Sequence, residues 1–183
     1  MQLKKILEKF YDARNLAFIQ SASNKDYVLA GNYLASCISK WEKLITDFKQ
    51  TSDIKGLRQF PVFPPNLKVS LGIDEKQSIT IHINFLIFKI GVIFCSYEDK
   101  ARIPIVNRSH EVLSSLSYYP FNEQQEKFAQ MVINKVQKTF PVVEVFNNFY
   151  ASTKARNVII DQVIVEEVDS YQVIFDDNLH GFF

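Results

Sequence analysis

The feature that most restricts the fold is a long apolar stretch over residues 79–94, whose length approaches that of a membrane span. Within it, isoleucine and phenylalanine alternate with polar residues such as His82, which is the period of a strand with one buried face. Lys89 and Gly91 then interrupt the run, and a lysine at mid-membrane is costly. The stretch therefore predicts strands, and no membrane segment is expected.

Strands are expected to dominate the middle of the chain. The segments concerned are short, rich in β-branched residues and separated by turn residues such as Gly72 and Asp74. Because the separations are short, neighbouring strands are expected to be antiparallel. The predicted strands are Leu67–Ile73, Ser78–Phe88, Val92–Tyr97 and Ala101–Asn107.

Helices are expected before these strands and after them. Apolar residues recur at helical spacing in 3–10 and again in 27–48, so residues 1–55 are predicted to form an antiparallel helical hairpin that turns at 21–26. A further helix is predicted over 122–140, where Asn122 has capping-box spacing to a glutamine three residues later.

Two other segments complete the organisation. Residues 56–66 hold three prolines and are predicted to be a connector; its Pro61-x-x-Pro64 pair also leaves open an SH3-type ligand. Residues 158–177 are predicted to form a β-hairpin that turns at Asp169 and Ser170. Grouped strands and separate helices favour a single α+β domain over residues 1–183, with helices packed on a mostly antiparallel sheet.

The composition is that of an ordinary intracellular globular domain. Of the 183 residues, 47% are hydrophobic and 22% charged. The first residues mix Lys4 and Lys5 with Glu8 and lack the apolar run of an export signal, so a cytoplasmic protein is expected. Cys37 and Cys95 have no zinc-ligand spacing and are predicted to be buried thiols.

Motifs for catalysis or for a cofactor are missing from the sequence. The five glycines are isolated, so no glycine-rich loop is present to hold a phosphate or a dinucleotide. His82 is predicted to be a surface or pairing residue on the polar side of its strand. Consecutive Ser109, His110 and Glu111 have hydrolase residue types but do not converge on one point. No catalytic residue, metal or cofactor is predicted.

Charge is balanced overall but uneven along the chain. The 21 basic and 20 acidic residues give a net charge of +1, whereas a dedicated nucleic-acid-binding protein has a basic excess. Phe149 and Lys154 belong to a weak interleaving of aromatic and basic residues, but nucleic acid is not the expected partner. Residues 141–183 hold 2 basic and 7 acidic groups, a net charge of −5.

The acidic C-terminal segment supplies the leading functional hypothesis. Its acids can protect a strand edge from aggregation, or they can attract a basic partner. The second use fits a non-enzymatic protein-binding module, such as an immunity or inhibitor protein that neutralises a basic toxin or nuclease, or a chaperone-like adaptor. The predicted partner-binding residues are Glu166, Glu167, Asp169, Asp176, Asp177, Phe182 and Phe183.

Two alternatives stay open on the sequence alone. One is an enzyme or a nucleic-acid-processing protein whose site assembles from scattered residues such as His82, Cys95 and His110 with nearby carboxylates. The other is a homodimer formed through the helical hairpin or an open sheet edge.

Overall fold

The structure is a computed structural model that describes residues 4–6, 25–62, 65–97, 115–160 and 163–175. These form an α+β fold. Residues 4–6 are helical. The other elements, in chain order, are α3 (Lys25–Lys49), β1 (Gly56–Gln59), β2 (Asn66–Gly72), β3 (Gln77–Asn84), β4 (Lys89–Ser96), β5 (Ser115–Ser117), α4 (Glu123–Thr139), β6 (Glu144–Val145), α5 (Asn148–Ala151), β7 (Lys154–Ile160), β8 (Val163–Asp169) and α6 (Ser170–Phe175).

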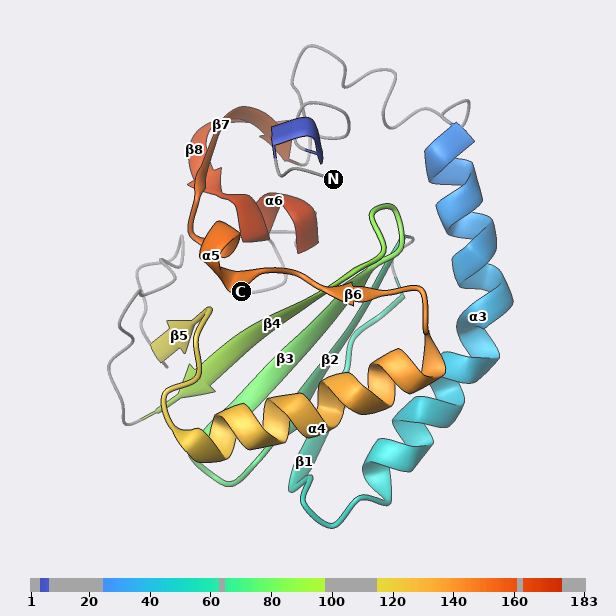
Figure 1. Cartoon of the computed structure of the whole chain (residues 1–183), viewed down its shortest axis with the longest axis vertical. Helices are drawn as coiled ribbons and strands as arrows, with labels where there is room; N and C mark the ends of the chain where they lie inside the picture. The colour runs from blue at the N-terminus through green and yellow to red at the C-terminus, as the bar shows by residue number, and fades with distance from the viewer. Residues whose placement is uncertain (1–3, 7–24, 63–64, 98–114, 161–162, 176–183) are drawn as a thin grey trace.

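Most of these strands belong to one mixed, mostly antiparallel sheet (Figure 1). Strands β1 to β5 lie side by side in chain order, each antiparallel to the next. Strand β6 is parallel to β4 and pairs with Lys89 and Ile90 at its start. Strands β7 and β8 pair only with each other among the described strands and form a small antiparallel hairpin.

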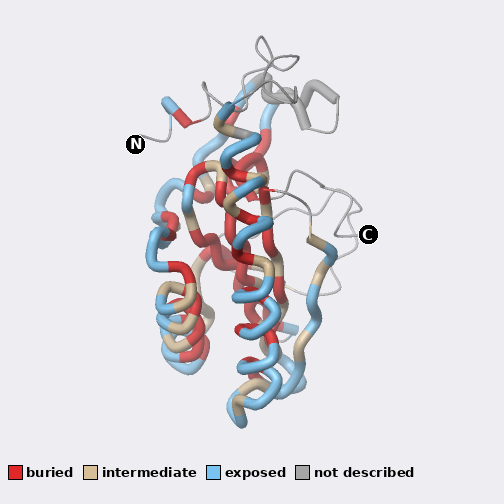
Figure 2. The backbone as a smooth tube through the Cα atoms, turned by 90° about the vertical axis from the view of Figure 1, so that its right-hand side faces the viewer, coloured by how far each residue is buried: buried red, intermediate tan, exposed pale blue. Residues whose placement is uncertain are grey.

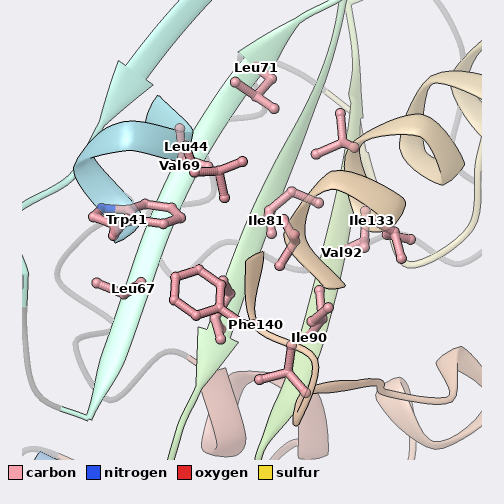
Figure 3. Packing of buried hydrophobic residues seen from close by; sticks show 14 of the residues in the cluster. Trp41, Leu44, Leu67, Val69, Leu71, Ile81, Ile90, Val92, Ile133 and Phe140 are labelled. Carbon is pink, nitrogen blue, oxygen red and sulfur yellow. The ribbon is translucent and has the colours of Figure 1, made fainter. Parts of the chain in front are cut away.

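One face of the sheet carries the main hydrophobic core. The register places Ile81 of β3 between Val69 of β2 and Val92 of β4, and all three side chains are buried on the same face. Helices α3 and α4 cover this face; in Figure 3, Trp41 of α3 lies over β2 and Ile133 of α4 lies beside Val92. Figure 2 shows that buried residues are concentrated in the sheet and on the inward sides of the helices.

The other face of the sheet is partly covered by α6 and the segment around it. A second cluster of buried residues joins Ile93 of β4 to Tyr171 and Phe175 of α6, and Ile6 from the start of the chain belongs to it. Gly91 of β4 allows this contact, because α6 packs directly over the position where a side chain would begin. The sheet thus lies between two layers of unequal size.

Much of the sequence-based organisation is confirmed. The predicted helices over 27–48 and 122–140 correspond to α3 and α4, and Asn122 caps α4 by accepting from the backbone N–H of Gln125 at 2.9 Å. Three of the predicted strands correspond to β2, β3 and β4. The fourth, over 101–107, and most of the first helix lie outside the described residues, so no N-terminal helical hairpin is shown.

The C-terminal hairpin differs from its prediction. It pairs β7 with β8 and is joined at residues 161–162, so the predicted turn at Asp169 and Ser170 is wrong. Residues 170–175 form helix α6 instead of a second strand. Their β-branched and aromatic side chains favour a strand locally, but Tyr171, Ile174 and Phe175 also have the spacing of one helix face, and packing against the sheet favours the helix.

The proline-containing connector also holds a strand that the sequence analysis did not predict. Residues 56–59 form β1 at the edge of the sheet, before Pro61. Four residues are too few for a periodic pattern to be recognised, and an edge strand tolerates a nearby proline because only one side of it is paired.

None of the helices within the described ranges has the length and apolarity that crossing a bilayer requires.

Adding one methyl group at Gly91 is expected to loosen the packing of α6 on the sheet. A Cβ at this position would lie 2.7 Å from the Tyr171 hydroxyl oxygen and 2.8 Å from a Phe175 ring carbon. We expect Gly91→Ala to lower the free energy of unfolding by about 1–3 kcal/mol, measured by urea denaturation.

Gly31 provides the matched control for this substitution. It lies inside α3, and nothing within 4 Å would meet an added Cβ. Gly31→Ala is expected to raise the free energy of unfolding by up to about 1 kcal/mol, because alanine favours a helix interior. Equal effects of the two substitutions would contradict the close packing at Gly91.

Candidate functional site

The described acids of the C-terminal hairpin lie opposite basic residues. Glu167 and Asp169 of β8 are the cross-strand partners of Arg156 and Lys154 of β7. Lys154 Nζ lies 2.8 Å from Asp169 Oδ1, and Arg156 Nε lies 3.3 Å from Glu167 Oε2. The two acidic charges are therefore matched by two basic charges on the neighbouring strand.

Asp169 has a structural role in addition to this ion pair. The residue is buried, and its carboxylate accepts a hydrogen bond of 2.9 Å from the hydroxyl of buried Tyr118. The next residue, Ser170, donates from both its backbone N–H and its hydroxyl to the carbonyl of Thr153. These contacts fix the point where β8 passes into α6, so Asp169 is not an exposed binding residue.

The remaining predicted partner-binding residues are only partly tested by the structure. The backbone of Glu166 lies in β8, but its side chain is outside the described part. Asp176, Asp177, Phe182 and Phe183 lie outside the described residues altogether. Of the predicted set, the structure brings together Glu167 and Asp169, two residues apart on one strand.

Polar side chains of β3 hold the end of α6. The Nδ1 atom of His82 lies 3.2 Å from the carbonyl oxygen of Phe175, and the Asn84 side-chain amide donates to the carbonyl oxygen of Ile174. The last carbonyls of a helix have no partner within the helix, so these two side chains supply what the backbone lacks. The same Asn84 side chain also accepts from the backbone N–H of Leu86 at 2.8 Å.

His82 is buried, although the sequence predicted a surface or pairing position for it. It does lie on the polar side of β3, but α6 covers that side, and the rings of Tyr171 and Phe175 contact the imidazole edge to face. Burial, followed by the charge of Lys68 on the neighbouring strand, lowers the pKa of His82 to about 3. The imidazole is therefore neutral near pH 7.

The two residues named for a Cys–His site are far apart. Both lie on the strand pair β3–β4, where Cys95 is opposite Ser78 and His82 is opposite Gly91. Four residues along a strand correspond to roughly 13 Å, which is too long for proton transfer between the two side chains. Cys95 and Cys37 are both buried free thiols, as predicted, and His110 lies outside the described residues.

Metal-binding groups do not gather in the described residues either. Within that part of the chain, no three histidine, cysteine, aspartate or glutamate side chains are placed to hold a metal ion. Two buried polar side chains in that part of the chain, Gln125 and Asp169, bond to the backbone or to other side chains. Gln125, for example, donates to the carbonyl of Cys95 and accepts from the N–H of Phe121.

Exposed aromatic side chains lie next to the acidic hairpin. Phe149 and Tyr150 of α5 form an edge-to-face pair with ring centroids 5.5 Å apart, and 72% and 42% of their surfaces are exposed. Figure 1 shows α5 at the base of the β7–β8 hairpin. Of the eight large hydrophobic residues that are exposed in the described part of the chain, four lie between residues 142 and 150: Val142, Val145, Phe149 and Tyr150.

The sequence contained only a weak signal for this surface. Phe149 and Tyr150 stood out there because Lys154 and Arg156 follow them, which suggested contacts to phosphate. In the structure both basic residues form ion pairs with carboxylates of β8. Their positive charge is therefore already matched by acids of the same hairpin.

Comparison with known proteins found no family model, no curated protein and no solved structure that matches this chain.

A lower pH is expected to destabilise the protein through His82. Its pKa is about 3 in the folded chain against an ordinary value of 6.5, so between these values the unfolded chain binds a proton that the folded chain excludes. This stability is complete above pH 6.5 and is lost as the pH falls, by about 1.4 kcal/mol per pH unit from this group.

The measurement is the free energy of unfolding as a function of pH, for the wild type and for His82→Gln. The variant is expected to be less stable near pH 7, because α6 loses its ring contacts, but to have a shallower dependence on pH. Identical slopes for the two proteins would show that His82 titrates normally.

Proposed function

We propose that this protein is a non-enzymatic module that binds another protein, as an immunity or inhibitor protein or a chaperone-like adaptor does. The observation that carries the proposal is the exposed aromatic pair Phe149 and Tyr150 at the base of the C-terminal hairpin. Large aromatic side chains exposed together in water are unfavourable in a monomer, and aromatic residues are the common anchors of protein interfaces.

The local geometry supports an anchor of this kind. Asn147 caps α5 by accepting from the N–H of Phe149 at 2.9 Å, and the buried Ala151 attaches the other end of this short helix. The preceding Phe146 is also buried, so the backbone on both sides of the aromatic pair is held by the core. A fixed backbone lowers the entropy that binding has to overcome.

The charge of residues 141–183 supports a basic partner. Lys154 and Arg156 are the only basic residues in 141–183, and both are paired with Asp169 and Glu167. Of the five other acids of this segment, Glu144 pairs with Lys89 of β4. The remaining four have no further basic residue within 141–183 to pair with: Asp161, Glu166, Asp176 and Asp177. Such an excess accelerates the approach of a positively charged protein.

The roles of three polar side chains are also consistent with a binding protein. The groups with catalytic potential, His82, Asn84 and Asp169, hold α6 and the hairpin in position. His110, which the alternative of an enzyme was expected to use, lies outside the described ranges.

Replacing the aromatic pair is expected to weaken partner binding. A tagged protein is used to recover the partner from the native cells, and the affinity is then measured with both proteins purified. We expect the double variant Phe149→Ser and Tyr150→Ser to raise the Kd by about 30-fold or more, since truncation of an aromatic anchor costs about 2 kcal/mol or more.

The matched control is the double variant Val28→Ser and Leu29→Ser. These residues are exposed at the start of α3, so the control also removes two exposed hydrophobic side chains. Its Kd is expected to stay within about twofold of the wild type. Equal affinities for both double variants and the wild type would contradict an interface at the aromatic pair.

The electrostatic part of the proposal has its own test. Changing Glu166, Glu167, Asp176 and Asp177 to the corresponding amides is expected to slow association and to flatten its dependence on salt, with little change in the dissociation rate. Stopped-flow or surface-based kinetics at several salt concentrations measure this. Unchanged association rates would leave the acids with the role of protecting a strand edge.

A further inference from the structure

A second surface lies at the other end of the sheet, on strand β1. This strand lies at one edge of the sheet, pairs only with β2 among the described strands, and is mostly exposed. In Figure 1 it lies at the end of the molecule opposite α5 and the hairpin. Nothing in the proposed function depends on it.

The main-chain groups of β1 are arranged to receive another strand. The N–H of Phe60 donates to the carbonyl of Lys68, which continues the register that pairs Arg58 with Ser70. Because bonded and non-bonded pairs alternate in an antiparallel ladder, the N–H and C=O groups of Leu57 and Gln59 face away from β2. These groups form a free sheet edge of the kind that binds extended peptides.

The charge at this edge is positive. Residues 54–73, which comprise β1 and β2 with their flanks, hold Lys55, Arg58 and Lys68 but no aspartate or glutamate. The nearest acids in the chain, Asp53, Asp74 and Glu75, lie beyond the end where Gly56 pairs with Gly72. Arg58 and Lys68 both lie over the Phe60 ring, 4.9 Å and 4.7 Å from its centroid. In the described part of the chain neither Lys55 nor Arg58 forms an ion pair.

We propose that β1 binds an extended acidic segment of a second partner protein by adding it as a strand to the sheet. The added main chain bonds to Leu57 and Gln59, and every second side chain of the segment lies beside Arg58. Acidic residues are therefore expected at alternate positions, on the side of Arg58 and Lys68. Apolar residues are expected between them, on the side where Leu57 packs against the core.

Charge argues against a second copy of this chain as the occupant. Antiparallel pairing of β1 with its own copy would bring the two Arg58 side chains close together, and β1 itself holds no acid to neutralise them. An acidic segment removes this repulsion. The homodimer is therefore an outcome of the test that would overturn the proposal.

The test selects ligands from a displayed library of random linear peptides with the full chain as target. We expect the enriched peptides to alternate acidic and apolar residues, and their binding to weaken as salt is raised.

Gln59→Pro removes an N–H that faces away from β2, so the fold is retained while the edge is blocked. The Kd of a selected peptide is expected to rise at least about tenfold in this variant, and likewise in Arg58→Glu.

Two measurements make the result specific. Urea denaturation shows whether Gln59→Pro remains folded, and Arg58→Gln serves as a second variant that removes the charge without a proline. The double variant at Phe149 and Tyr150 is expected to bind the peptide as the wild type does, so this surface and the proposed function succeed or fail separately.

Three results would overturn the proposal. The first is selection of no peptide, or of peptides without an acidic excess. The second is binding that is unaffected by both Gln59→Pro and Arg58→Glu. The third is a wild-type dimer that Gln59→Pro converts to a monomer, which would show that a second copy occupies the edge.

Discussion

The hydrogen bonds from β3 to two helix-end carbonyls determine where α6 lies on the sheet. His82 and Asn84 bond to the last two carbonyls of α6, and the absence of a side chain at Gly91 lets the helix approach the sheet. Helix α6 follows β8 directly, so the hairpin is positioned by the same contacts. The polar side chains of His82 and Asn84 thus hold a six-residue helix that would not be stable alone.

The polar groups that could carry chemistry have structural roles in the described part of the chain. The imidazole of His82 is surrounded by aromatic rings, and its lowered pKa follows from that burial. Asp169 is occupied by Lys154 and Tyr118. The two ends of the molecule expose different surfaces. One end has the aromatic pair Phe149 and Tyr150 near an acidic segment, and the other has the edge of strand β1 with Arg58. A protein that joins two partners of opposite charge would use both.

The parts of the fold that were predictable are those with long periodic patterns. Helix α4 has an apolar stripe and a cap at Asn122, and β3 alternates over eight residues. Strand β1 and α6 are too short for such a signal, and the choice of helix for residues 170–175 depends on Gly91, which is 79 residues earlier in the chain. The candidate site was less predictable still, because the exposure of Phe149 and the pairing of Asp169 with Lys154 are properties of the folded chain alone.

The most direct test of this account is the protonation state of His82 in solution, measured from its ring nitrogen chemical shifts by NMR at about pH 5. Because a carbonyl only accepts, the contact with Phe175 requires the proton to be on Nδ1, and burial requires Nε2 to be unprotonated. The account predicts a neutral imidazole in this tautomer. A ring protonated on both nitrogens at this pH would contradict it, since α6 could not then enclose His82 on the sheet.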